Sequence, residues 1–236
     1  MATATSTPTA YAEPRQRAAF DRRALAVLMP IGPLAIAVVR GILPYYTNDS
    51  NTVMAAKVAA HQGAETAVIW LTFVAMLTLV PGVIALGLFA RRGSSRVGTV
   101  GLVLAVAAFL SLFWSTVAGS DNVALAAARL GTPPGATGAL LTSMGNITPI
   151  GLASNVFVLG HIVGLILIGI ALWRSRLVPR WAALLLAVSQ LLHLVFAVII
   201  PVHALDGCAW GLTAVGFAVA AVAFAGERPH RPAHSS

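Results

Sequence analysis

Residues 151–200 read GLASNVFVLGHIVGLILIGIALWRSRLVPRWAALLLAVSQLLHLVFAVII. Two apolar runs, about 150–173 and 178–202, flank the short basic turn RSRLVPR at residues 174–180. Each run exceeds the roughly 20 residues that an α-helix needs to cross a 30 Å hydrocarbon core. A segment in lipid must satisfy its own backbone hydrogen bonds, so helices are the expected form. This stretch therefore predicts two antiparallel transmembrane helices.

Four more apolar runs of similar length occur along the chain, at about 24–45, 66–90, 97–119 and 206–225. Apolar residues make up 58% of the chain and charged residues 9%, whereas a soluble domain has roughly 25% charged residues. The sequence therefore predicts an all-α integral membrane bundle of six transmembrane helices over residues 24–225. Residues 1–23 are polar and end in basic residues, which predicts a disordered tail, and residues 226–236 form a second tail.

The basic residues predict the orientation of these helices. Cationic side chains are retained on the cytoplasmic side of a membrane. With both termini in the cytoplasm, twelve of the fifteen Lys and Arg residues fall inside, in four groups: Arg15/Arg17/Arg22/Arg23, Arg91/Arg92/Arg96, Arg174/Arg176/Arg180 and Arg228/Arg231. We therefore expect a multi-pass protein of a bacterial cytoplasmic membrane, with membrane lipids as partners. No basic stripe with interleaved aromatic residues is present, so no nucleic-acid partner is expected.

The five tryptophans and the two long outer segments add to this prediction. All five tryptophans lie near predicted span ends, as in an aromatic belt at the headgroup boundary: Trp70, Trp114, Trp173, Trp181 and Trp210. The outer loop at residues 120–149 contains the helical pattern NVALAAARL, a TPPG break and the apolar piece GALLTSM. Because loops of this length are usually functional or disordered, we expect short amphipathic helices on the outer surface there and in residues 46–65.

His161 and His193 are the most suggestive polar pair inside the spans. Each lies sixteen residues from Leu177 in the basic turn, so an antiparallel hairpin places them at the same depth, and Gln190 shares the helix face of His193. Neutral imidazoles can form one interhelical hydrogen bond, relay protons, or hold a metal or haem b. An ordinary structural contact between helices remains the alternative.

Arg40 lies in the outer third of the first span. Its guanidinium can snorkel to the headgroups, anchor an anionic group inside the bundle, or pair with Asp121 or Asp206. Together with the two histidines and Gln190, it defines a predicted ligand-binding cavity that opens outward. No cofactor is required by this arrangement, and haem b ligated by His161 and His193 is the alternative.

A metal site on the outer rim is a further candidate. His61, His203 and Asp206 could provide nitrogen and oxygen ligands to a divalent ion, although no HExxH motif is present. The single cysteine, Cys208, excludes an internal disulfide and a cysteine-based metal cluster, and we expect it to be a small buried hydrophobic residue.

Several classes of protein are disfavoured. The chain has no Walker A, GxGxxG or GxSxG motif, so nothing indicates nucleotide binding or serine hydrolysis. The interiors of the predicted spans contain no Asp or Glu, which argues against a proton-coupled carboxylate carrier and against prenyl-transfer or terpene-cyclase chemistry.

The segment LGHIVGLILIGIALWRSRLVPRWAALLLAVSQLLH is similar to a hairpin in a large group of uncharacterised bacterial multi-span proteins. The shared features are Gly160 and Gly164, the Arg174-Ser175 turn and the Pro179-Arg180 start of the next span. The resemblance, from the second span onward, implies a six-helix fold and carries no activity with it.

The first functional hypothesis is therefore non-enzymatic. It is a membrane protein that binds or moves a small molecule or lipid through an outward-facing cavity lined by Arg40, His161, Gln190 and His193. The alternatives are a membrane-embedded haem or redox protein that uses the two histidines, and a metal-dependent membrane hydrolase with ligands on the outer rim.

Overall fold

The computed structural model describes residues 14–117 and 119–226, with side chains described for 21–113 and 119–226. Over these ranges the secondary structure is helical, with no strand. Six helices are long and apolar enough to cross a membrane, so the prediction of an all-α six-span bundle is confirmed. They are α1 (Pro14–Ile42), α3 (Gln62–Arg91), α4 (Ser95–Val117), α7 (Thr148–Ser175), α8 (Arg180–Leu194), which continues as the π-helix η1 (Val195–Ile199), and α9 (His203–Gly226).

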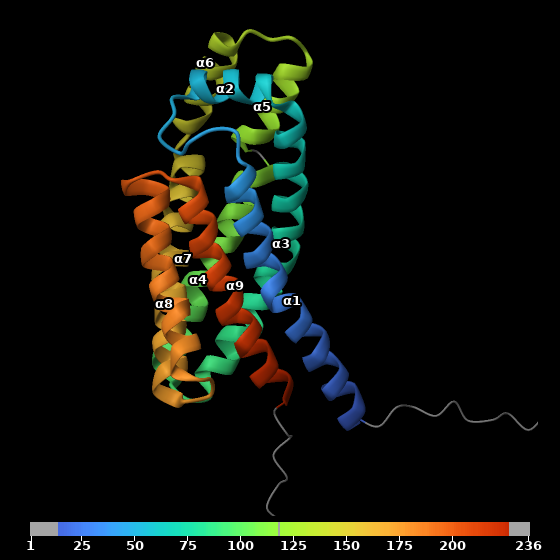
Figure 1. The fold of residues 1–236 in the computed structure, drawn as a ribbon, viewed down its shortest axis with the longest axis vertical. Helices are drawn as coiled ribbons and strands as arrows, with labels where there is room; N and C mark the ends of the chain where they lie inside the picture. The colour runs from blue at the N-terminus through green and yellow to red at the C-terminus, as the bar shows by residue number, and fades with distance from the viewer. Residues whose placement is uncertain (1–13, 118, 227–236) are drawn as a thin grey trace, which may run out of the picture.

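The six long helices form one bundle, with α1 packed between α3 and α9 and α4 packed along α7 (Figure 1). Three short helices lie across one end of it: α2 (Asn51–Ala60), α5 (Ser120–Arg129) and α6 (Pro134–Gly145). They share a small apolar core that includes Met54, Val58 and Leu141. We call these three helices the cap. The short helices predicted for residues 46–65 and 120–149 are therefore confirmed.

The amino-terminal boundary differs from the prediction. Helix α1 begins at Pro14, so residues 14–23 are helical and the predicted disordered tail is wrong there. Arg15, Arg17, Arg22 and Arg23 all lie on this extension, and Arg and Ala, which make up six of its ten residues, are good helix formers. The remainder of the predicted tails, 1–13 and 227–236, lies outside the described residues.

The basic groups of the described chain gather at the end opposite the cap. Figure 1 shows the α3–α4 and α7–α8 turns at the same end of the bundle as the start of α1 and the end of α9. These turns carry Arg91, Arg92 and Arg96, and Arg174, Arg176 and Arg180. This arrangement is the one that the positive-inside rule requires of a six-span protein with both termini in the cytoplasm.

Cysteine labelling tests that orientation. In a Cys208→Ser background, Leu130→Cys lies on an 84% exposed position of the cap, and Arg96→Cys lies on an exposed position of the opposite end. We expect a membrane-impermeant maleimide to label Leu130→Cys on intact cells and Arg96→Cys only after lysis. The reverse pattern would show that the cap faces the cytoplasm.

Helices α4 and α7 approach each other closely because small residues meet at their crossing. A Cβ atom added to Gly164 would lie 2.6 Å from the backbone nitrogen of Ala105 and 2.9 Å from the carbonyl oxygen of Gly101. At Gly160, the added atom would lie 3.0 Å from the carbonyl oxygen of Leu104. Close backbone approach at small residues is the usual way that membrane helices associate without a hydrophobic driving force.

Two predictions about single residues of α9 are wrong. Trp210 is 2% exposed and lies inside the bundle rather than in an aromatic belt, because it faces the other spanning helices. Cys208 is exposed rather than buried, because it lies two residues from Asp206 and Trp210 and therefore on the opposite side of the helix. Trp70, Trp173 and Trp181 are exposed, as predicted, and the side chain of Trp114 lies outside the described residues.

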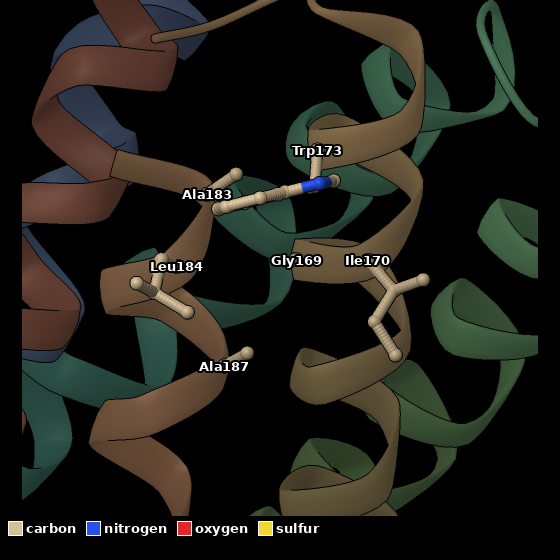
Figure 2. A pocket seen from close by; sticks show the side chains of 6 residues that line it. All are labelled: Gly169, Ile170, Trp173, Ala183, Leu184 and Ala187. Carbon is tan, nitrogen blue, oxygen red and sulfur yellow. The ribbon is translucent and has the colours of Figure 1, made fainter. Parts of the chain in front are cut away.

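An apolar groove of about 240 Å³ lies between α7 and α8 at the basic end of the bundle. Figure 2 shows the indole of Trp173 extending from α7 toward Ala183 on α8. The two helices approach closely at Gly169, where an added Cβ atom would lie 2.9 Å from the carbonyl oxygen of Ala183. The guanidinium of Arg180 lies 5.5 Å from the Trp173 ring centroid. The groove therefore combines an apolar floor with a cationic end.

Candidate functional site

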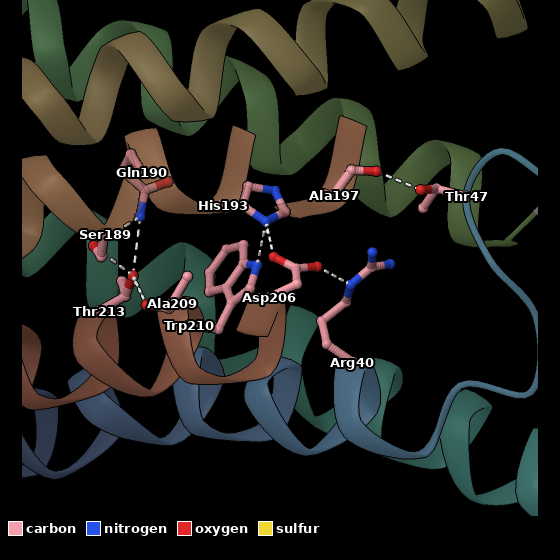
Figure 3. Close-up of polar contacts among 10 residues, drawn as sticks. All are labelled: Arg40, Thr47, Ser189, Gln190, His193, Ala197, Asp206, Ala209, Trp210 and Thr213. Atoms are coloured by element: carbon pink, nitrogen blue, oxygen red, sulfur yellow. Dashed lines mark hydrogen bonds and ion pairs between the residues drawn. The ribbon is translucent and has the colours of Figure 1, made fainter. Parts of the chain in front are cut away.

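Arg40, Asp206 and His193 form a continuous polar chain across three helices. The Nε atom of Arg40 on α1 donates to Asp206 Oδ2 on α9, and Asp206 Oδ1 lies 2.5 Å from Nδ1 of His193 on α8 (Figure 3). The Asp206 side chain is fully buried. It lies in the first turn of α9, where the positive end of the helix dipole favours a carboxylate. The ion pair anticipated for Arg40 is thus made with Asp206.

His193 is oriented by this carboxylate. Its Nδ1 atom lies 2.5 Å from Asp206 and 3.1 Å from the indole nitrogen of Trp210. Nδ1 cannot form both bonds at once. It would have to be unprotonated to accept from the indole N–H of Trp210, which only donates, and protonated to donate to the carboxylate of Asp206. The shorter bond to a carboxylate is the stronger of the two, so Nδ1–H donates to Asp206. Figure 3 shows the second ring nitrogen turned away from Asp206, which leaves Nε2 for another partner.

A cavity of about 150 Å³ lies beside this chain. Side chains from all six spanning helices line it, and most of them are apolar, including Phe109 and Phe157. Its polar lining consists of Arg40, Thr72 and His193. The Nη2 atom of Arg40 is buried and has no hydrogen-bond acceptor among the described residues. The cavity thus has an apolar body and one polar side with an unused donor.

His161 lies next to His193, as the hairpin register predicts. The two ring centroids are 5.2 Å apart, and the His161 ring stacks on Phe157 at 4.4 Å. Its Nδ1 atom lies 2.6 Å from the carbonyl oxygen of Phe157 and donates to it. This bond fixes the neutral tautomer in which Nε2 is an acceptor. That atom is buried and without a partner in the described part of the chain. His161 contacts His193 but is not among the residues that line the cavity.

Gln190 belongs to a separate polar contact between α8 and α9. Its Nε2 atom donates to Thr213 Oγ1 at 3.0 Å, and the hydroxyls of Thr213 and Ser189 lie 2.9 Å apart. All three side chains are buried. Gln190 therefore joins two helices, one turn away from His193. The sequence predicts Gln190 in the cavity lining, but it is not among the residues that line the cavity.

Two buried acidic side chains lie at the ends of spanning helices. Helix α3 begins at Gln62 and α9 at His203, so Glu65 and Asp206 both fall in the first turn of a spanning helix, and both are 0% exposed. Glu65 directly precedes the predicted span 66–90, and Asp206 is the first residue of the predicted span 206–225, so neither lies in the interior of a predicted span. The spanning helices therefore contain two buried carboxyl groups that could take part in proton-coupled chemistry.

Glu65 faces a second polar cluster between the bundle and the cap. Tyr45, in the linker after α1, donates from its hydroxyl to Asp121 Oδ1 in the first turn of α5. Burial, followed by the neighbouring charge of Asp121 and then that of Glu65, raises the pKa of Tyr45 well above its usual value. Burial also raises the pKa of Asp121, although the bond from Tyr45 and the charge of Arg40 oppose this shift.

The three residues proposed as rim metal ligands do not come together. His61 is exposed at the α2–α3 junction, His203 packs against Tyr46 with ring centroids 4.3 Å apart, and Asp206 is bonded to Arg40 and His193. Among the residues with described placement, no group of three His, Cys, Asp or Glu side chains is arranged to hold a metal ion.

The sequence analysis did not identify Trp210, Phe157 or Tyr45 as parts of these sites. The spacing of Asp206, Trp210 and Thr213 places them on one face of α9, and this face meets His193 and Gln190 of α8. A search for polar residues at helical spacing on neighbouring spans would have found that interface. Comparison with protein-family models, curated proteins and solved structures gives no match to this chain.

Proposed function

We propose that this protein binds a small amphipathic molecule in the cavity between its six spanning helices. The observation that carries the proposal is the buried Nη2 atom of Arg40, which lacks an acceptor among the described residues and belongs to a side chain that lines the cavity. A buried cationic donor without a partner costs free energy, and the polar end of a ligand would remove that cost.

The size of the cavity defines the size of the ligand. An apolar cavity of roughly 150 Å³ holds one benzene molecule, and pockets for drug-sized ligands reach roughly 300–1,000 Å³. The cavity here, at about 150 Å³, therefore suits a molecule of about six to ten non-hydrogen atoms. A whole lipid or a haem is much larger, so this volume favours the small-molecule hypothesis over the haem alternative.

The chemistry of the lining defines the polarity of the ligand. Arg40 is always protonated and presents a free donor, while Nε2 of His193 can accept or, when protonated, donate. Phe109 and Phe157 provide an apolar surface for the rest of the molecule. A small aromatic or short-chain carboxylate has this combination of an anionic end and an apolar body.

Three probes of similar size and different polarity test this proposal: benzoate, benzamide and toluene. With the full chain in lipid nanodiscs, benzoate should raise the melting temperature most, because it is the one probe of the three with an anionic end for Arg40. A ligand at 100 times its Kd stabilises the native state by about 2.7 kcal/mol. Arg40→Lys keeps a charge for Asp206 but loses the guanidinium fork, so it should reduce the benzoate shift at least tenfold in apparent affinity. Thr72→Leu, which fills the cavity, should abolish it.

Gln190→Leu is the matched control, because Gln190 is buried on α8 one turn from His193 but outside the cavity lining. It should lower stability by about 0.6 kcal/mol, the average for a polar contact between membrane helices, and leave the benzoate shift unchanged. Equal stabilisation by toluene and benzoate, or a wild-type protein that none of the three stabilises, would contradict the proposal.

We also infer that the protein resides in a bacterial cytoplasmic membrane with its cap outside. The gathering of the Arg groups at the opposite end supports this orientation. Anionic lipids are the expected partners at that end, since the groove beside Trp173 offers an apolar surface for an acyl chain and Arg180 a cation for the headgroup.

A further inference from the structure

The buried polar groups near the cap contain more acids than bases. Asp206 is satisfied by Arg40 and His193. Asp121 accepts a hydrogen bond from the neutral hydroxyl of Tyr45, and no described group bonds to Glu65. Two other cations of this end have other contacts, since Lys57 pairs with Asp49 at 2.7 Å and Arg129 donates to Thr66 at 3.0 Å.

Glu65 is the least satisfied of these acids. It is 0% exposed, and neither of its carboxyl oxygens has a hydrogen-bond partner within the described ranges. An isolated buried carboxylate is so unfavourable that such a group neutralises instead. A metal ion would be one way to neutralise it, but no third His, Cys, Asp or Glu joins Glu65 and Asp121 in the described part of the chain. A proton needs no further ligand.

We propose that Glu65 is a proton-binding site that exchanges its proton with solution when an anionic ligand enters or leaves the neighbouring cavity. The coupling rests on the function proposed above. Protonated Glu65 would compensate the charge that the ligand brings to Arg40, so that ligand and proton bind together.

Helix α3 connects the two sites. Thr72 lines the cavity together with Arg40, and it lies seven residues, or two helical turns, from Glu65 on α3. A ligand carboxylate next to Arg40 therefore places a negative charge roughly 10 Å along this helix from Glu65. That charge makes a negative charge on Glu65 less favourable and so strengthens proton binding there. By linkage, the protonated form of Glu65 must then bind the ligand more tightly.

Infrared spectroscopy of the ligand-free protein tests whether Glu65 carries a proton. The full chain in nanodiscs at neutral pH should show the carbonyl band of a protonated carboxylic acid. Growth on ¹³C-labelled glutamate should shift this band, and Glu65→Gln should remove it, while Asp49→Asn should leave it unchanged. The isotope shift identifies the band as that of a glutamate without a mutation. The chain has three glutamates, and Glu65 is the one outside the terminal segments, in which Glu13 and Glu227 lie. A spectrum with no such band at neutral pH, or a band that survives in Glu65→Gln, would overturn the proposal.

The pH dependence of benzoate binding tests the coupling. Above the pH at which the infrared band disappears in the ligand-free protein, the affinity should fall about tenfold for each pH unit if one proton is bound with the ligand. Glu65→Gln should bind benzoate without this fall, whereas dependence retained in that variant would assign the proton to another group such as His193 and refute the coupling. Absence of benzoate binding by the wild type would refute the proposed function and the coupling, while the infrared band would still report the proton on Glu65.

Discussion

Asp206→Leu is expected to lower the free energy of unfolding by about 3–5 kcal/mol, the usual cost of removing one partner of a buried ion pair. The carboxylate is fully buried and accepts from both Arg40 and His193, so the substitution leaves a guanidinium and an imidazole without their acceptor. The loss should be measured as a shift of the unfolding midpoint in SDS titrations of the protein in mixed micelles.

The double variant Arg40→Met/Asp206→Leu separates the ion pair from the packing around it. Replacing both partners with apolar side chains is often nearly neutral, so the double variant should regain most of the stability that either single variant loses. Asp49→Asn is the control, because Asp49 pairs with Lys57 near the surface and such pairs contribute less than about 1 kcal/mol. Additive losses in the double variant would mean that the two side chains do not depend on each other.

Gly164→Leu is expected to prevent stable packing of α4 on α7. Even a single added carbon would lie 2.6 Å from the Ala105 backbone nitrogen, which no side-chain rotation relieves. Overpacking in a core usually costs about 1–3 kcal/mol, and more where backbone must move. We expect the variant to insert into the membrane but to lose its folded fraction on size-exclusion chromatography in detergent.

Gly211→Leu provides the matched comparison, with the same change in another spanning helix. No described atom lies within 4 Å of a Cβ atom added at Gly211, so this variant should elute and melt like the wild type. If both variants behaved alike, close contact between α4 and α7 would not be the reason for the effect.

The number and approximate limits of the spans were predictable because each depends on local composition alone. The depth of His161 and His193 followed from counting residues outward from the α7–α8 turn, and their rings are in fact 5.2 Å apart. These features are periodic or symmetric along the chain. Helical geometry converts them directly into positions.

The contents of the site were harder to predict because they depend on contacts between distant segments. Arg40 and Asp206 are 166 residues apart, so the sequence offers Asp121 and Asp206 as possible partners of Arg40 but does not select between them. The change of hydropathy at residue 66 predicts a loop at Glu65, although helix α3 extends beyond it to Gln62. The burial of Trp210 likewise depends on which face of α9 meets the other helices.

The bond between Arg40 and Asp206 joins the first spanning helix to the last. During synthesis, α1 therefore enters the bilayer long before the ribosome has made its counterion on α9. Until then, Arg40 must remain hydrated at the membrane surface or inside the insertion machinery, because a lone charge in lipid is costly. The final closure of the bundle thus waits for translation of α9, and a chain truncated before α9 would keep Arg40 without this counterion.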